Sequence, residues 1–298
     1  MLDYTLLTAF AAVIRHGSFD AAASALGLTQ SAISQRIKLL EERFGSTLII
    51  RGQPAQPTSS GKTLLRHVQE VQMLERALTD DLGIATDAPT TLRIAVNADS
   101  LASWFLVALA DFTQDHPNIY FDLITDDQDH SAEWLKSGEV VAAVTAIARP
   151  ISGCDCTSLG NFRYIATASP AFVSRYFPNG VTIAALSQAP ALQYDTKDQL
   201  QNQWAQRESG ASLKAQHHVV PSTQGFIDAA KLGLGWGMNP AHLVEPLIRS
   251  GELVGLGQNP QFDIPLYWQC NRITAKTLAP LTKAVRNVTK DQKSAASL

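Results

Sequence analysis

Cysteine is scarce in this 298-residue sequence, and long apolar runs are absent from it. Of the three cysteines, Cys154 and Cys156 are separated by one residue, which is neither a zinc-ligand spacing nor a redox CxxC motif, so we expect reduced thiols. The longest apolar stretch, residues 140–148, is far shorter than the roughly 20 residues of a membrane span. Because the acidic Asp3 stands where a signal peptide carries positive charge, we expect a soluble cytoplasmic protein with no membrane partner.

Signatures of common enzyme classes are also missing. The sequence contains no P-loop, no HExxH and no GxSxG motif. The glycines of GLGWG at 233–237 lack the GxGxxG spacing and follow an expected helix rather than a strand. His217 and His218 lie in an expected strand without a metal-ligand partner at a suitable spacing, which favours a structural role. We therefore predict that the protein is not an enzyme and uses no cofactor and no metal.

Charge is small in total but uneven along the chain. The net charge is −3, of which residues 1–66 carry +3 and the remainder −6. A mildly basic N-terminal part joined to an acidic body fits two tasks better than one, and it suits nucleic acid as the partner of the basic part. A chain of this length with 45% hydrophobic residues suggests roughly two domains.

Three short helices are expected at the N-terminus. Apolar residues recur at helical spacing over 4–15, Gly17 ends that run, and Ser18 caps an alanine-rich helix through Leu26. A third helix follows Thr29 as its N-cap. An alanine-rich helix, a glycine turn and a helix with a polar front end are typical of a helix-turn-helix, whose second helix enters the DNA major groove. The predicted buried stripe of the third helix consists of Ile33, Ile37, Leu40 and Phe44.

The polar front end of the third helix is suited to contact with DNA. Glutamine can pair with adenine edges, short serine side chains reach phosphates or bases, and a helix N-terminus attracts phosphate. A solvated helix face is the alternative interpretation. The residues predicted to contact DNA are Thr29, Gln30, Ser31, Ser34, Gln35, Arg36, Lys38 and Arg51.

The segment after the third helix has the pattern of a hairpin that leads into a long helix. Residues 46–61 contain a short strand, a turn with two prolines and a helix start capped by Thr58 or Ser59, which is typical of the wing of a winged helix. The long helix then carries a narrow apolar stripe, which predicts a partner helix and hence a dimer that reads two half-sites. Packing on its own chain alone is the alternative, and Pro89 marks a linker. The stripe consists of Leu64, Val68, Val71, Leu74, Leu78 and Leu82.

The remaining residues predict an α/β domain with two lobes. Buried-strand runs at 91–96, 119–125 and 139–145 alternate with amphipathic helices, and a second alternating set spans 189–250. Such alternation predicts a parallel sheet, with a ligand bound at strand ends in the cleft between the lobes. We expect residues 264–272 to cross back to the first lobe and a terminal helix to cover it.

Over its whole length the chain resembles a LysR-type transcriptional regulator. The motifs TQSAISQRIKLLEERFG at 29–45 and PTSSGKTLL at 57–65 carry this resemblance. A narrower resemblance is to the ArgP/LysG-type branch, which regulates arginine and lysine export, although Ile49 stands where LysR-type chains often have Phe. The motifs similar to that branch are NADSLASW at 97–104, GEVVAAVT at 138–145, RYFPNGVT at 175–182 and LYW at 266–268.

The resemblance implies a domain division and a function. It implies a winged helix-turn-helix at 1–60, a dimerisation helix at 61–88 and an effector-binding domain similar to periplasmic binding proteins at 89–298. Lobe I would comprise about 89–163 and 265–298, and lobe II about 164–264. The implied function is a transcriptional regulator that senses lysine or arginine and controls an exporter gene. Its implied partners are an operator, the effector, RNA polymerase and further copies of itself, as a dimer of dimers. The alternative is a solute-binding module whose N-terminal part packs DNA nonspecifically or contacts a protein.

Candidate effector-binding residues lie mainly at strand ends. Strand 91–96 is followed by a helix start whose free N–H groups can hold a carboxylate, although simple capping by Asp99 or Ser100 is the alternative. A cationic side chain also needs a carboxylate partner. The acidic residues at 126–127 are equally explained as a solvated loop, and Trp104 as part of the core. The candidates are Asn97, Asp99, Ser100, Trp104, Asp126, Asp127, Thr145, Asp195, Ser222 and Thr223.

Overall fold

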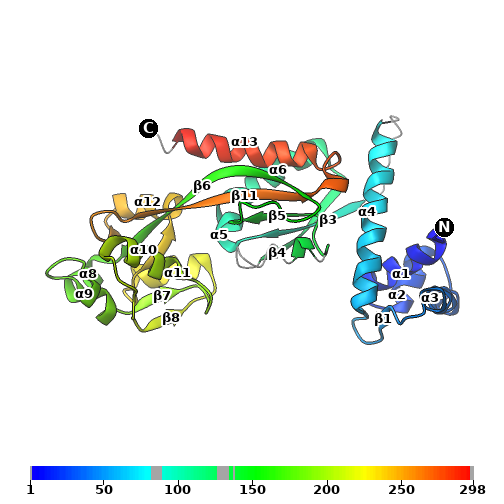
Figure 1. The fold of residues 1–298 in the computed structure, drawn as a ribbon, viewed down its shortest axis with the longest axis horizontal. Coiled ribbons are helices and arrows are strands. Elements are labelled where there is room, and N and C mark those ends of the chain that lie inside the picture. The colour runs from blue at the N-terminus through cyan, green and yellow to red at the C-terminus, as the bar shows by residue number, and fades with distance from the viewer. Residues whose placement is uncertain (1, 82–88, 126–133, 137, 296–298) are drawn as a thin grey trace.

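The chain forms a helical head and two α/β lobes that follow one another along the long axis of the molecule (Figure 1). The computed structural model describes residues 2–81, 89–125, 134–136 and 138–295. We use lobe II for residues 169–260 and lobe I for the other described residues from 89 onward. Within these ranges, no helix is both long and apolar enough to cross a membrane.

The three helices of the head have the ends that the sequence predicted. Ser18 Oγ accepts the N–H of Ala21 at 3.1 Å, and Thr29 Oγ1 accepts the N–H of Ala32 at 3.2 Å, so that each residue caps the helix that follows it. A glycine at positive φ follows each of the three helices, because only a residue without Cβ adopts this backbone conformation without strain. The helices are α1 (Tyr4–His16), α2 (Phe19–Leu26) and α3 (Gln30–Phe44).

The helices of the head pack around one apolar core. Ile33, Ile37 and Leu40 of α3 are buried in it, as their spacing predicted. The extension of this stripe to Phe44 is wrong, because Phe44 is the last residue of α3 and its ring, 42% exposed, lies outside the core of the head.

A short antiparallel hairpin connects α3 to a long helix. Thr58 Oγ1 caps the long helix by accepting the N–H of Gly61 at 3.0 Å. Glycine is required at position 61, because a Cβ there would collide with the backbone carbonyl of Leu48 beside the hairpin. The elements are β1 (Ile49–Ile50), β2 (Gln56–Pro57) and α4 (Ser59–Asp81).

The apolar stripe of α4 divides into two parts. Leu64 and Val68 are buried against the head, whereas Leu74 and Leu78 are 46% and 59% exposed. Leu82 lies outside the described residues. The first half of the stripe therefore stabilises the head of its own chain, and the second half leaves apolar side chains exposed.

Helix α4 also contacts lobe I. Lys62 Nζ lies 3.0 Å from Glu139 Oε1, and Asn271 Nδ2 donates a hydrogen bond to Glu70 Oε1 at 2.9 Å. These contacts involve two separate segments of lobe I. They orient the head relative to the lobe within the single chain.

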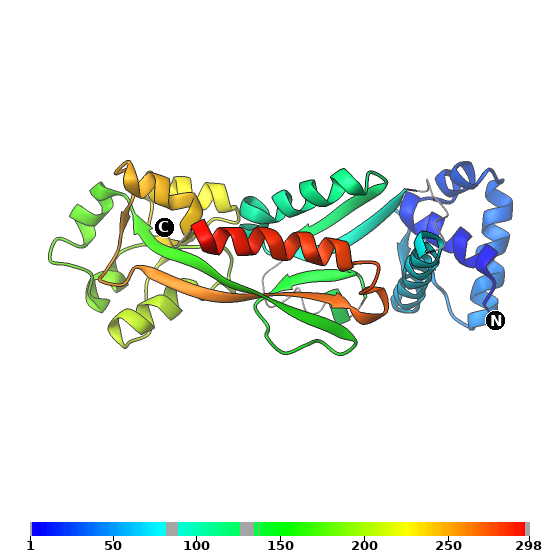
Figure 2. The same cartoon turned by 90° about the horizontal axis from the view of Figure 1, so that it is seen from above.

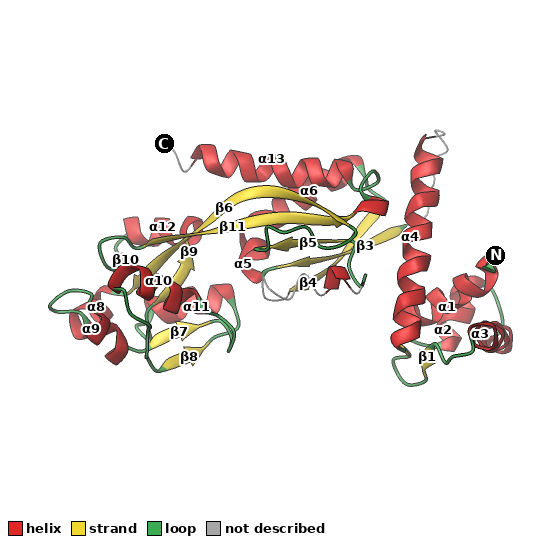
Figure 3. Ribbon diagram, viewed as in Figure 1, coloured by secondary structure: helices red, strands yellow, loops and turns green. Residues whose placement is uncertain are grey.

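One seven-stranded sheet extends through both lobes (Figure 3). Its strand order is β10-β6-β11-β5-β3-β4, with β9 paired to β6. β3 is parallel to both β4 and β5, but β11 is antiparallel to both β5 and β6. The predicted strands at 91–96, 119–125 and 139–145 therefore pair in parallel as expected. The antiparallel part of the sheet was not predicted, and it arises because β6 and β11 carry the chain out to lobe II and back, which requires opposite directions. The strands are β3 (Thr90–Val96), β4 (Ile119–Thr125), β5 (Ala142–Thr145), β6 (Cys154–Ala168), β9 (Gly237–Pro240), β10 (Val254–Gly255) and β11 (Gln261–Asn271).

Helices cover the sheet of lobe I and enclose an aromatic core. Figure 2 shows the terminal helix α13 lying along β6 and β11, and Trp268 Nε1 of β11 donates to Thr282 Oγ1 of α13 at 3.0 Å. The aromatic core contains the buried side chains of Trp104, Phe105 and Trp268. The described helices of lobe I are α5 (Ala98–Ser100), the π-helical η1 (Leu101–Phe105), α6 (Leu106–Asp115), η2 (Arg272–Thr274) and α13 (Ala279–Ala295).

Lobe II has its own small parallel pair of strands surrounded by helices. β7 pairs with β8, and an isolated bridge joins Ala191 of β7 to Trp236. The elements are α8 (Pro170–Tyr176), α9 (Ile183–Gln188), β7 (Ala191–Gln193), α10 (Leu200–Ser209), β8 (His217–Val219), α11 (Thr223–Lys231) and α12 (Ala241–Arg249).

Candidate functional sites

The N-terminal end of α3 presents polar side chains to solvent at the outer edge of the head (Figure 1). Thr29 Oγ1 and Ser31 Oγ lie 3.0 Å apart, and Lys38 Nζ lies 3.8 Å from Glu42 Oε1. Of the predicted DNA contacts on this helix, Thr29, Gln30, Ser31, Gln35 and Lys38 are exposed, and Ser34 and Arg36 are half-buried. A polar, exposed helix N-terminus that can enter a groove is what DNA recognition by this motif requires.

Arg51 lies just after β1 and begins the turn that connects β1 to β2. Its side chain is exposed, and the guanidinium lies 5.6 Å from the centre of the Phe19 ring at the start of α2. This cation–π contact positions the charge of Arg51 beside the helix-turn-helix.

A cavity of about 350 Å³ lies between the two lobes. This volume falls within the usual range of small-molecule sites, roughly 300–1,000 Å³. Among the predicted effector contacts, those that line it are Asn97, Asp99, Asp195 and Thr223. Side chains of both lobes therefore share one cavity, as the predicted cleft requires.

The carboxyl group of Asp99 joins three elements at this cavity. Tyr164 of β6 donates its hydroxyl hydrogen to Asp99 Oδ2 at 2.8 Å, and Thr223 of α11 donates to Asp99 Oδ1 at 2.8 Å. Asp99 itself lies in α5, directly after β3. Since Thr223 belongs to lobe II, the hydrogen bond from its hydroxyl links the two lobes.

The electrostatic environment of the cavity disfavours further negative charge. Burial raises the pKa of the Asp99 carboxyl, the hydrogen bonds from Thr223 and Tyr164 lower it, and the nearby Asp198 raises it again, with a net increase. Burial, followed by the charges of Asp99 and Asp195, likewise raises the pKa of the Tyr194 hydroxyl. A cationic group in the cavity would stabilise the ionised form of Asp99.

A tight turn fixes the other carboxylates of the cavity. Asp195 Oδ1 accepts the N–H groups of Lys197 at 2.7 Å and Asp198 at 3.0 Å. Asp198 in turn accepts the N–H groups of Tyr194 at 2.9 Å and Leu200 at 3.0 Å. The cavity wall therefore includes three carboxyl groups together with the side chain of Lys197.

Buried acceptor atoms without partners also occur at this site. The Oδ1 atoms of Asn97 and Asn239, and Ser100 Oγ, have no hydrogen-bond partner among the described residues. Both asparagines line the cavity, and Ser100 is completely buried beside it. Because buried polar atoms are normally paired, this surplus of acceptors suits a ligand rich in N–H groups.

Four of the described effector candidates do not line the cavity, namely Ser100, which is buried beside it, and three residues that lie elsewhere. Trp104 is 1% exposed and packs in the core of lobe I. The Thr145 hydroxyl is buried and accepts the N–H of Ile147 at 3.1 Å, while Ser222 Oγ caps α11 by accepting the N–H of Gly225 at 3.2 Å. We therefore withdraw these three residues as effector contacts. Asp126 and Asp127 lie outside the described residues.

Sequence reasoning missed Tyr164, Tyr194 and Asn239. Tyr164 lies within a long strand rather than at a strand end, and it reaches Asp99 across 65 residues of sequence. Asn239 lies in the short strand GMNP, and an asparagine inside an otherwise apolar strand was the feature of the sequence that could have identified it as a candidate.

The described ranges show no metal-binding arrangement of three or more His, Cys, Asp or Glu side chains. Cys154, Cys156 and Cys270 are free thiols, and burial raises the pKa of Cys270 to about 11. Thiols with a raised pKa are poor nucleophiles at neutral pH.

The architecture and two family models identify the class of the protein. Residues 4–62 match the bacterial regulatory helix-turn-helix protein, lysR family, and residues 86–292 match the LysR substrate binding domain. The chain belongs to the LysR family of transcriptional regulators, which are not enzymes, in agreement with the prediction from the sequence.

Among individual relatives, the chain is similar to regulators of the predicted branch. It is 43% identical over 289 residues to the HTH-type transcriptional regulator ArgP of Pseudomonas aeruginosa, covering 95% of this chain and 94% of that protein. A crystal structure of ArgP from Mycobacterium tuberculosis matches with a TM-score of 0.82 and 39% identity, covering 97% and 98% of the two chains. Full-length LysG from Corynebacterium glutamicum with bound effector Arg matches with a TM-score of 0.71 and 32% identity, covering 97% and 99%.

Proposed function

We propose that the protein is a transcriptional regulator that binds an operator through its head and senses a basic amino acid, lysine or arginine, between its lobes. The carboxyl group of Asp99 carries this proposal. It faces a cavity that contains two further carboxyl groups and unpaired amide oxygens. A ligand ammonium or guanidinium would supply charge-assisted hydrogen bonds to such a site. The arginine bound to the similar LysG supports the same ligand class.

We further propose the domain roles given by the resemblance. Residues 1–60 act as a winged helix-turn-helix with the β1–β2 hairpin as its wing, and 61–88 as a dimerisation helix. The exposed Leu74 and Leu78 support a partner helix at α4. Residues 89–298, similar to periplasmic binding proteins, hold the effector.

The proposed mechanism is a shift between two arrangements of the lobes. A ligand that contacts both lobes stabilises the arrangement in which they are close, since it gains contacts only there. In a dimer or tetramer this shift moves the heads, changes the bend of the bound DNA and thereby changes recruitment of RNA polymerase. The regulated gene would encode an amino-acid exporter, and the protein would act in the cytoplasm.

Calorimetric titration of the full chain with L-lysine and L-arginine tests the effector. We expect saturable binding of at least one of them. Asp99→Asn should weaken that binding by about 30-fold or more, because loss of a buried charged partner costs roughly 2–5 kcal/mol. Asp115→Asn, an exposed carboxyl at the end of α6, is the matched control and should bind like the wild type. If neither amino acid binds, the effector assignment is wrong and only the DNA-binding role stands.

A further inference from the structure

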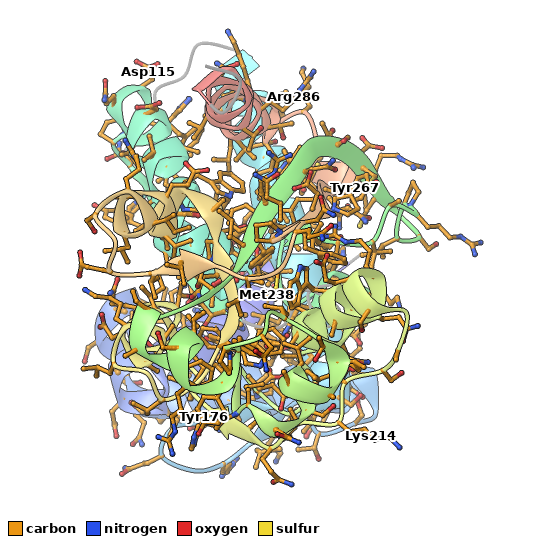
Figure 4. All side chains as sticks on the ribbon, turned by 90° about the vertical axis from the view of Figure 1, so that its left-hand side faces the viewer. Asp115, Tyr176, Lys214, Met238, Tyr267 and Arg286 are labelled. Atoms are coloured by element: carbon orange, nitrogen blue, oxygen red, sulfur yellow. The ribbon has the colours of Figure 1, made fainter. Side chains whose placement is uncertain are left out.

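Asn239 is a completely buried polar residue at the wall of the cavity. It lies in β9 between Met238 and Pro240, and all three residues line the cavity. Figure 4, seen from the lobe II end, shows Met238 near the middle of the view, among closely packed side chains. β9 packs tightly against α11 because Gly237 leaves room for the Phe226 ring, with which a Cβ would collide.

Two contacts set the orientation of the Asn239 amide. Its Nδ2 donates to Thr167 Oγ1 at 2.9 Å and, more weakly, to the backbone oxygen of Gly237 at 3.5 Å. A backbone oxygen can only accept, so the nitrogen and not the oxygen of the amide must lie on that side. The Oδ1 atom is consequently the buried acceptor that has no partner among the described residues.

The charges of the cavity indicate what this oxygen would bind. The lining contains the carboxyl groups of Asp99, Asp195 and Asp198 against the cation of Lys197, and Asn97 Oδ1 is a further acceptor without a partner among the described residues. A ligand oxygen next to Asn239 Oδ1 would place two acceptors in contact, whereas a ligand N–H would pair it. Since Asp99 is in lobe I and Asn239 in lobe II, a cationic ligand would engage both lobes.

We propose that Asn239 is a specificity-determining residue, whose Oδ1, oriented by Thr167, accepts an N–H hydrogen bond from the cationic side chain of the effector. Thr167 is a positioning residue, because it contacts the amide and not the ligand. This inference rests on the proposed function, namely that the cavity binds a basic amino acid.

Titration of the full chain with L-lysine and L-norleucine tests the inference. Norleucine has the same backbone groups as lysine but no side-chain nitrogen, so the ratio of the two affinities reports on that nitrogen alone. Asn239→Leu should weaken lysine binding about tenfold or more and strengthen norleucine binding. The ratio of lysine affinity to norleucine affinity should therefore fall. Asn239→Asp keeps an acceptor oxygen and should retain the preference for lysine. Thr167→Val should reduce the preference, because the amide is then free to rotate.

Controls separate a binding role from a structural one. Asn161→Asp and Asn161→Leu change an exposed asparagine of β6 outside the cavity and should leave both affinities unchanged. If Asn239→Leu does not fold in a thermal unfolding experiment, Asn239→Asp and Thr167→Val decide the question. An unchanged lysine-to-norleucine ratio in Asn239→Leu or, if that variant does not fold, in Thr167→Val, with lysine bound by the wild type, would overturn the role of Asn239 alone. A wild type that binds neither lysine nor arginine would overturn the proposed function together with it.

Discussion

At the scale of single residues, the buried carboxyl group of Asp99 makes the stability of the folded protein depend on pH. Its pKa is raised above the ordinary 3.8 chiefly by burial, so the ionised form is disfavoured in the empty cavity. The folded protein therefore binds a proton at the Asp99 carboxyl group more tightly than the unfolded chain does. At pH values above the raised pKa, the ionised Asp99 lowers the free energy of unfolding of the ligand-free protein, and this penalty diminishes as the pH falls through that pKa.

We predict that Asp99→Asn raises the melting temperature of the ligand-free protein at pH 7 and that the difference from the wild type shrinks toward mildly acid pH. The reason is that the substitution removes a disfavoured charge while keeping one acceptor oxygen for Tyr164 or Thr223. The affinity of the wild type for arginine should also fall as the pH is lowered through this range, because the arginine cation needs the ionised carboxyl group of Asp99 as its partner. Calorimetric unfolding and arginine titration from pH 4 to 8 measure both quantities. A variant less stable than the wild type throughout this range would contradict the burial argument.

The residues of the cavity were only partly predictable. Asn97, Asp99 and Thr223 follow strands or begin helices, and such positions are visible as local patterns in the sequence. Tyr164 and Asn239 lie inside strands, and their roles depend on how β6 and β9 pair across 70 or more residues. Local patterns carry no information about that pairing.

At the scale of elements, the ends of the head helices were predictable because caps and glycine turns act within a few residues. The opposite directions of β6 and β11 were not predictable, because an alternation of strands and helices does not reveal which strands leave one lobe for the other. The polar face of α3 was also visible in the sequence. Its Gln30 is exposed in the first turn of the helix.

We predict that Gln30→Ala weakens binding to the operator by about tenfold, the loss expected for one base contact of roughly 1–3 kcal/mol. Binding to random DNA and to the effector should be unchanged, because neither depends on a base edge. Fluorescence anisotropy with operator and scrambled duplexes measures the preference. Gln224→Ala, an exposed glutamine on α11 in lobe II, is the control. Equal losses on both duplexes would instead identify Gln30 as a phosphate contact.

At the scale of the whole molecule, contacts between α4 and lobe I connect the head to the part of the chain that forms the cavity. Asn271 has two tasks at this contact, since Nδ2 donates to Glu70 of α4 and Oδ1 accepts the N–H of Ile273 in η2. Asn271→Asp keeps the oxygen that caps η2, but it loses the donor and places a negative charge beside Glu70.

We predict that Asn271→Asp leaves the separate affinities for arginine and for free operator near their wild-type values. The factor by which arginine changes operator affinity should fall toward one, because the contact that transmits the change is weakened. Operator titrations with and without saturating arginine measure this factor. Asn161→Asp, which adds the same charge on β6 away from α4, should retain it. An unaltered factor in the Asn271 variant would mean that coupling does not pass through this contact.

The continuity of lobe II has a consequence for protein engineering. Residues 169–260 form one uninterrupted stretch that leaves lobe I by β6 and returns by the neighbouring, antiparallel β11. The stretch is therefore a cassette, whose exchange with that of a relative would preserve the strand order of lobe I. Such an exchange would transfer Tyr194, Thr223 and Asn239 together and leave Asp99 behind. Chimeric biosensors built at these two junctions would vary most of the cavity wall while the carboxyl group of Asp99 and the DNA-binding head stay constant.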